Sequence, residues 1–225
     1  MIVVTGASRG LGRALCERLL QSGEEVFGLA RQVGGLPFPA LACDVASHTD
    51  VRVAAQHLRA QGVAVTALVN AAGIAAMNLA LTTPPAKVRQ IVEVNLLGTI
   101  FCCQQFAPLM VRRKAGTIIN FSTIAVALGL KGESVYAASK AGVEGFTRAF
   151  AREMADFGIT VNCIAPGPID TELLNGVSRE QIGRIVAQQV IARQFTPEAV
   201  CDVAQMILGP QGRSLSGQVF HIGGA

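Results

Sequence analysis

The chain has 225 residues, of which 51% are apolar and 15% charged, and its net formal charge is +4. The high apolar content excludes a disordered chain, and glycines without a period exclude a collagen-like one. The basic residues cluster only at Arg112-Arg113-Lys114, which is more typical of a solvated helix end than of a nucleic-acid site. We therefore expect one well-packed domain and no nucleic-acid partner.

The expected elements alternate between short apolar strands and longer helical patterns, which is typical of a parallel sheet built from βαβ units. In chain order they are a strand at 2–5, a helix at 11–21, strands at 25–30 and 41–43, a helix at 51–61, a strand at 67–70, a helix at 86–113, a strand at 117–122, a helix at 134–156, a strand at 160–164, a lid at 172–196, a helix at 198–208 and a strand at 218–221. Only about eight residues, including Gly34-Gly35 and Pro37, separate the second and third strands. A parallel crossover normally needs a dozen or more residues, so we predict a helix-free connection that leaves the sheet thinly covered there.

The compartment follows from the cysteines and the N-terminal segment. The six cysteines form no CxxC motif and have no metal-ligand spacing with the three histidines, so we expect free thiols, no metal site and a reducing cytosol. The opening Met1-Ile2-Val3-Val4 has no basic leader, and we expect no secretory signal. Residues 61–86 carry no charge, but Asn70, Gly73 and Pro84-Pro85 interrupt them, which favours a buried strand and a loop over a membrane span. We expect a cytoplasmic, soluble protein without a membrane partner.

A glycine-rich turn follows the first expected strand. It reads Thr5-Gly6-Ala7-Ser8-Arg9-Gly10-Leu11-Gly12 and leads directly into the first helix. The three glycines allow a tight turn, close approach of a pyrophosphate and close packing of helix on strand. The helix N-terminus offers free N–H groups and a positive dipole end, so this strand–turn–helix unit predicts a dinucleotide site.

The end of the second strand bears on the choice of cofactor. It reads Gly28-Leu29-Ala30-Arg31, without the carboxylate that would bind the ribose 2′-hydroxyl of NAD. Either Arg31 and Arg9 are ordinary surface residues, or they bracket a 2′-phosphate, which the guanidinium suits. The missing acid favours NADP(H). Asp44 and Val45 follow the third strand, where Asp44 either meets the adenine or caps the next helix.

Tyr136 and Lys140 stand four residues apart in the helix expected at 134–156 and so share one of its faces. A nearby ammonium lowers the pKa of a phenol from its ordinary value of about 10, which lets the phenol act as general acid or base. Such pairs also occur by chance on surfaces. Here Ser122 and Thr123 end the preceding strand, and their hydroxyls would converge on the same pocket. That convergence predicts a site that polarises a carbonyl group.

Together these motifs resemble those of the short-chain dehydrogenases/reductases, and among them the β-ketoacyl-acyl-carrier-protein reductases. The resemblance covers essentially the whole chain. It rests on the glycine turn, Asn70-Ala-Ala-Gly73, Asn95, Ser122-Thr123, Tyr136 with Lys140, and Pro166-Gly167-Pro168-Ile169-Asp170-Thr171. It implies a Rossmann-type, doubly wound parallel α/β sheet in one domain spanning residues 1–225.

The resemblance also implies roles for the matching residues. Tyr136 donates a proton to the substrate carbonyl as hydride arrives from the nicotinamide. Lys140 holds the nicotinamide ribose and depresses the pKa of the tyrosine, and Asn95 fixes a water that links Lys140 to solvent. The residues expected to bind NADP(H) are Gly6, Ser8, Arg9, Gly10, Leu11, Gly12, Arg31, Asp44, Val45, Asn70, Ala71, Gly73, Tyr136, Lys140, Pro166, Gly167, Ile169 and Thr171.

The chain departs from the family pattern at three places. Family members usually carry the catalytic serine thirteen residues before the tyrosine, and this count from Tyr136 reaches Thr123 rather than Ser122. Register favours Thr123, although its methyl group crowds the pocket, and a shift of one residue would place Ser122 there. The short second crossover is another departure. The last is the end of the chain, residues 220–225, which lacks the acid before two glycines that many relatives carry.

The expected lid bears on the substrate. Its Ile182, Ile185, Val186 and Val190 recur at helical spacing and either contact the substrate or pack in the core. An apolar lid suits a lipophilic ketone, so we expect NADPH-dependent reduction of a 3-oxoacyl thioester, linked to acyl carrier protein or coenzyme A, in fatty-acid or polyketide-type synthesis. The alternatives are an NADP-dependent secondary alcohol or hydroxysteroid-type dehydrogenase and a non-catalytic NADP-binding regulator. The cluster Arg112-Arg113-Lys114 would attract an acidic carrier protein, and the resemblance implies a homotetramer or dimer.

Overall fold

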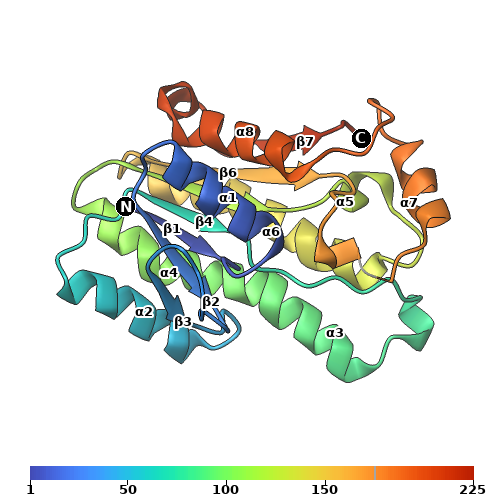
Figure 1. The fold of residues 1–225 in the computed structure, drawn as a ribbon, viewed down its shortest axis with the longest axis horizontal. Helices are drawn as coiled ribbons and strands as arrows, with labels where there is room; N and C mark the ends of the chain where they lie inside the picture. The colour runs from blue at the N-terminus through green and yellow to red at the C-terminus, as the bar shows by residue number, and fades with distance from the viewer. Residues whose placement is uncertain (175) are drawn as a thin grey trace.

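A parallel sheet of seven strands forms the centre of the computed structural model, which describes residues 1–174 and 176–225 (Figure 1). The strand order is β3-β2-β1-β4-β5-β6-β7, and every neighbouring pair is parallel. The strands are β1 (Ile2–Thr5), β2 (Val26–Ala30), β3 (Ala40–Ala42), β4 (Ala67–Asn70), β5 (Gly116–Phe121), β6 (Ile159–Pro166) and β7 (Val219–Ile222). This arrangement confirms the doubly wound sheet expected from the sequence.

Helices cover both faces of the sheet, which explains why the strands are apolar throughout rather than alternating. Every residue of β1, β2 and β4 is buried. On one face lie α1 (Gly10–Gln21) and α8 (Pro197–Leu208), which share a core with the side chains of Ile2 and Val4. On the other face lie α2 (His48–Ala60), α4 (Gly98–Val111) and α6 (Ser134–Ala155). Figure 1 shows α1 and α8 on the opposite side of the sheet from α2 and α4.

The crossover from β2 to β3 contains no helix, as predicted. It does not leave the sheet bare, because Phe38 folds back and is buried. A Cβ atom at Gly28, in the middle of β2, would lie only 2.7 Å from the Phe38 ring. One aromatic ring seated on a glycine therefore covers part of this face in place of a helix.

The helix expected at 86–113 is not continuous. It consists of α3 (Pro85–Val92), a π-helical turn η2 (Glu93–Leu97) and α4. Among the described residues, Pro85–Val111 is the one helical stretch long and apolar enough to span a membrane. Its Phe106 and Met110 are fully buried in the core beside the sheet, as in the core helix of a globular domain.

The remaining elements are short. They are α5 (Ala125–Leu128), α7 (Arg179–Val186) and the 3₁₀ turns η1 (Ala80–Thr82), η3 (Glu172–Leu174) and η4 (Pro210–Ser214). Ser178 starts α7 with a capping box, in which its hydroxyl accepts from the Gln181 N–H and the Gln181 side chain accepts from the Ser178 N–H. The described part of the expected lid thus contains a short helix.

Candidate active site

The order of the strands reverses beside β1, because the chain passes outward to β2 and β3 and then returns to β4 on the other side. Ligands of doubly wound sheets bind at the carboxyl ends of the strands next to such a reversal. The turn from β1 to α1 and the residues after β4, β5 and β6 all lie at this edge. These are the segments in which the sequence predicts functional residues.

The glycine turn has the geometry of a phosphate site. Gly6 and Gly10 have φ angles of +68° and +55°, which L side chains rarely adopt, and a Cβ at Gly12 would collide with the Gly6 carbonyl oxygen. α1 begins at Gly10 with no side-chain cap and no acid in its first turn. Its first N–H groups are therefore available to an anion.

The predicted arginine pair lies beside this turn. The Ala7 N–H donates to the Leu29 carbonyl oxygen over 3.2 Å, which holds the turn against the end of β2. Arg9 lies two residues after Ala7, and Arg31 comes directly after β2. Both side chains are exposed. The two segments that carry the arginines are thus joined, with both guanidinium groups open to a ligand.

Asp44 and Asn70 make contacts that define their local roles. The Asp44 carboxylate accepts from the Ala46 N–H over 3.0 Å, whereas Ser47 caps α2. The alternative that Asp44 caps this helix was therefore wrong. Asn70 donates through Nδ2 to Asn120 Oδ1 over 2.8 Å, and this buried pair ties the end of β4 to β5.

Lys140 is buried beneath the carboxyl edge of the sheet. Its Nζ donates to the Phe121 carbonyl oxygen at the end of β5 over 2.8 Å. Burial lowers the pKa of Lys140 to about 8, because the charged form loses its hydration. A Cβ at Gly73 would lie 3.4 Å from Nζ, so this glycine leaves space beside the ammonium.

The π-helical turn places Asn95 beside Lys140. The buried Asn95 side chain accepts from the Ile74 N–H over 2.8 Å and donates to the Ile74 carbonyl over 2.9 Å and to Ser139 Oγ over 3.1 Å. Ser139 in turn donates to the Tyr136 carbonyl oxygen over 2.7 Å. Asn95 therefore joins the loop after β4 to the part of α6 that carries Tyr136 and Lys140.

The two neighbouring hydroxyls after β5 have different surroundings. Ser122 donates to Glu144 Oε1 over 2.7 Å, and Arg148 donates to Oε2 of the same carboxylate over 3.1 Å. Thr123 instead lies against the Tyr136 phenol, where its hydroxyl lowers the pKa of that group. Both residues line the pocket, and the role of Thr123 at the carbonyl stays a prediction.

The ionisation of Tyr136 differs from expectation. Burial raises the pKa of the phenol well above its ordinary value, and the nearby Glu133 carboxylate raises it further. The net direction is opposite to the lowered pKa expected beside Lys140, because the loss of solvation dominates. Tyr136 is thus held as a protonated phenol in an enclosed site.

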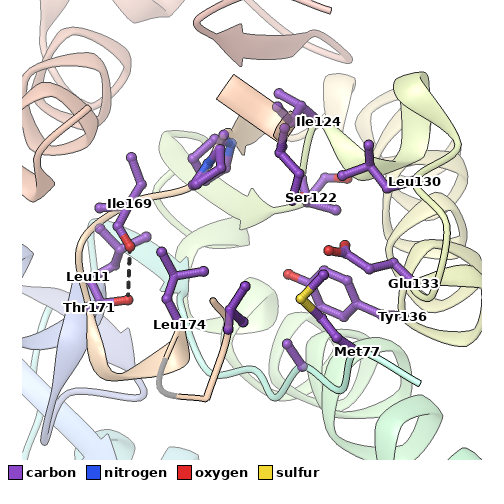
Figure 2. Close-up of a pocket in the computed structure, with 17 residues that line it drawn as sticks. Leu11, Met77, Ser122, Ile124, Leu130, Glu133, Tyr136, Ile169, Thr171 and Leu174 are labelled. Atoms are coloured by element: carbon purple, nitrogen blue, oxygen red, sulfur yellow. Dashed lines mark hydrogen bonds between the residues drawn. The ribbon is translucent and has the colours of Figure 1, made fainter. Parts of the chain in front are cut away.

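The pocket in front of Tyr136 is mostly apolar (Figure 2). It encloses about 100 Å³ and receives residues from the glycine turn, the ends of β5 and β6 and the lid. The lining residues are Leu11, Ala75, Met77, Ser122, Thr123, Ile124, Leu130, Glu133, Tyr136, Pro166, Gly167, Pro168, Ile169, Thr171, Leu174, Val177 and Ile185. In Figure 2 the Tyr136 hydroxyl and the Glu133 carboxylate both face the cavity.

Comparison with known proteins shows which family has this arrangement. The family model described as short chain dehydrogenase matches residues 1–182, which include the glycine turn, Tyr136 and Lys140. The chain is a short-chain dehydrogenase. This family comprises oxidoreductases that use a nicotinamide cofactor.

Curated relatives of this short-chain dehydrogenase match over nearly its full length. The 3-oxoacyl-acyl-carrier-protein reductases FabG of Staphylococcus aureus and Vibrio harveyi are each 31% identical to it, over 99% of this chain and 96% and 95% of theirs. Among solved structures, the ligand-free aldohexose dehydrogenase of Thermoplasma acidophilum superposes with a TM-score of 0.88 at 27% identity, covering 99% of this chain and 92% of its own. The crystal structure of gox2181 superposes with a TM-score of 0.92 at 24% identity, covering 98% and 93%.

The structure gathers most of the predicted site residues of this short-chain dehydrogenase at one edge. Ser122, Thr123, Tyr136, Pro166, Gly167, Ile169 and Thr171 share the pocket, and Asn95 and Lys140 lie directly behind it. Of the expected lid face, Ile185 reaches the pocket, whereas Val190 is exposed. Sequence reasoning missed Met77, Leu130 and Glu133, of which only Glu133 carried a signal, as a charged residue three positions before Tyr136.

The basic cluster lies elsewhere. Arg112, Arg113 and Lys114 follow α4 and precede β5, so they lie at the amino edge of the sheet, where the charge of Arg113 acts on the N-terminal ammonium of Met1. The pocket opens at the carboxyl edge. The cluster therefore does not line the pocket, and its attraction for an acidic carrier protein stays a prediction.

Proposed function

We propose that this short-chain dehydrogenase reduces the ketone of a 3-oxoacyl thioester to the 3-hydroxyacyl form with NADPH. The observation that carries the proposal is the meeting of Thr123 and the buried, protonated Tyr136 at one apolar pocket, with Lys140 behind them. The full-length similarity to two 3-oxoacyl-acyl-carrier-protein reductases supports the substrate class. We place the activity in fatty-acid or polyketide-type synthesis, in a cytoplasmic homotetramer.

The residues present fit a dinucleotide. The uncapped start of α1 offers N–H groups to the pyrophosphate, and Arg9 and Arg31 offer guanidinium groups to a 2′-phosphate. Lys140 uses one of its three N–H donors on Phe121, so the others remain for the ribose hydroxyls. No carboxylate follows β2 to repel a 2′-phosphate, which supports NADP(H) over NAD(H).

The chemistry divides simply between cofactor and protein. When bound, the nicotinamide supplies the hydride to the carbonyl carbon. Tyr136 gives its phenolic proton to the carbonyl oxygen, and the Thr123 hydroxyl donates a hydrogen bond to the same oxygen as negative charge develops there. Lys140 stabilises the phenolate left behind, and the apolar pocket excludes water. In the reverse direction the phenolate accepts the proton of a secondary alcohol.

The test is steady oxidation of NADPH with an acetoacetyl thioester, followed by absorbance. We expect turnover by the wild-type protein and its loss in Tyr136→Phe, since phenylalanine fills the space but carries no proton. Phe157→Tyr, at an exposed site beyond α6, is a control that changes tyrosine content without touching the pocket. Binding of NADPH without turnover of any ketone would instead support a non-catalytic binding protein.

A further inference from the structure

The pocket contains one ionisable group, among its described lining residues, that carbonyl reduction does not require. Among its described lining residues only Tyr136 and Glu133 ionise, and most of the others are aliphatic. Glu133 directly precedes α6, and Figure 2 shows its carboxylate directed into the cavity beside the phenol. Its charge is close enough to raise the pKa of Tyr136. An acid so near the reacting carbonyl would meet the substrate itself.

The Glu133 carboxylate accepts no side-chain or backbone hydrogen bond from the part of the chain that the structure describes, and it does not cap α6. Neither cation near it in sequence neutralises it. Lys140 is bonded to the Phe121 carbonyl oxygen, and Lys131 is exposed. Partial burial raises the pKa of Glu133, because the charged carboxylate loses part of its hydration. The group thus has unused acceptor capacity that faces the pocket.

A carboxylate before a helix also has a purely structural explanation, since the N-terminal end of the helix dipole attracts negative charge. That explanation accounts for an acid at this position but not for its direction into a mostly apolar pocket. The two explanations differ in a measurable way. A helix-end role affects stability alone, whereas a role in the pocket changes which ketones react.

We propose that Glu133 selects substrates, accepting a hydrogen bond from an N–H or O–H group near the reacting carbonyl and disfavouring ketones with a carboxylate there. The inference rests on the proposed carbonyl reduction and narrows its substrate class. Two chemical sources supply such a donor. One is the amide N–H of a pantetheine-type thioester arm, and the other is a hydroxyl on the carbon next to the ketone.

Matched substrate pairs test the proposal. The first pair is the acetoacetyl thioester of N-acetylcysteamine and the acetoacetyl thioester of pentanethiol, which lacks the N–H. The second is 1-hydroxybutan-2-one and 1-methoxybutan-2-one. The third, acetoacetate and methyl acetoacetate, tests the exclusion of a carboxylate. Each is assayed for kcat/KM with NADPH in the wild type, Glu133→Gln, Glu133→Leu and Glu153→Gln, an exposed control on α6.

We expect the wild type to favour the donor-bearing member of at least one of the first two pairs by about tenfold or more, because a hydrogen bond to a charged group is strong. That ratio should fall toward one in Glu133→Leu and stay unchanged in Glu153→Gln. Glu133→Gln, which is close in shape, should raise the kcat/KM of acetoacetate relative to its methyl ester. The pair whose ratio depends on Glu133 identifies the source of the donor.

Ratios that stay the same in Glu133→Leu and Glu133→Gln would overturn the inference and leave carbonyl reduction standing, even if the melting temperature falls. Should Glu133→Leu fail to fold, the acetoacetate ratio in Glu133→Gln decides alone. No turnover of any of the six ketones by the wild type would overturn the proposed function, and this inference with it.

Discussion

At the scale of single residues, adjacent side chains after β5 have separate tasks. Ser122 holds a buried carboxylate on α6, because Glu144 accepts from it and also pairs with Arg148. Thr123 has a hydroxyl next to the phenol instead. Both residues line the pocket, but their hydroxyls have different partners.

Alanine at each position should separate the two tasks. We expect Thr123→Ala to lower kcat about 10²- to 10³-fold, the usual effect of losing a donor to a developing oxyanion, with little change in melting temperature. Ser122→Ala should cost about 1–3 kcal/mol of stability, because it leaves a buried Glu144 oxygen without its partner, while kcat falls less. Assays of kcat together with urea unfolding check this. A larger loss of kcat in Ser122→Ala would contradict the assignment of Thr123.

Lys140 links function to stability through its lowered pKa of about 8, against an ordinary value of 10.5. Between these values the unfolded chain binds a proton that the folded chain releases, so stability rises with pH across this interval. Below pH 8 the folded protein carries the buried ammonium at full cost. The buried ammonium that the site holds beside Tyr136 therefore lowers the free energy of unfolding at neutral pH.

We expect Lys140→Met, without cofactor, to be more stable than wild type by about 1–3 kcal/mol at pH 7, because the variant has no buried charge. The lost hydrogen bond to Phe121 offsets part of this gain. The advantage should shrink as the pH rises from 8 to 10.5. Urea unfolding at pH 7, 9 and 10 measures it, and a stability difference independent of pH would contradict burial of a charged lysine as the cause.

At the scale of elements, the π-helical turn η2 fixes the loop after β4 to α6. Asn95 satisfies both the N–H and the carbonyl of Ile74 and also bonds Ser139. A π turn inside a longer helix is often found at a functional site. Here it places a buried amide where a regular helix from Pro85 to Val111 would have placed a different side chain.

Asn95→Ala should therefore release the loop. We expect faster amide hydrogen exchange at residues 73–78, a loss of about 1–3 kcal/mol in stability from the unpaired groups of Ile74, and a lower kcat. Gln104→Ala, at an exposed site on α4, is the control. Unchanged exchange in the loop would show that other contacts hold it.

The sequence predicts local patterns of this fold well and spatial relations less well. Strand β1 and strand β4 match their predicted bounds, because apolar runs between turn residues mark buried strands. The sequence did not predict the π-helical turn, because the spacing of apolar residues from Pro85 to Val111 is that of a helix whether or not one turn is wider. The sequence also did not predict that Glu133 lines the pocket or that the pKa of Tyr136 is raised. Both depend on burial by lid and loop residues that are distant in the sequence.

At the scale of the whole molecule, ligand binding should stabilise the entire sheet, because the glycine turn directly follows β1, which lies inside the sheet between β2 and β4. A ligand at 100 times its Kd adds about 2.7 kcal/mol to the free energy of unfolding. We expect NADPH to raise the melting temperature more than NADH at equal concentration. Arg31→Asp should reverse the order, since a carboxylate repels the 2′-phosphate and accepts from a 2′-hydroxyl.

Thermal unfolding followed by circular dichroism with each cofactor makes this measurement independent of any substrate. Arg52→Asp, exposed on α2, has the same change of charge and should keep the order of the wild type. If Arg31→Asp keeps the wild-type order too, the two arginines do not bracket a 2′-phosphate.

The reactivity of the buried cysteines would report where the fold opens. Cys16, Cys43, Cys102, Cys103, Cys163 and Cys201 are all buried and free. They are spread over α1, the segment after β3, α4, β6 and α8, so both faces of the sheet carry them. Burial raises the pKa of each thiol, which keeps it unreactive until its surroundings open. The order in which a thiol reagent labels them in the wild-type protein would therefore show which of the two helical layers separates first from the sheet.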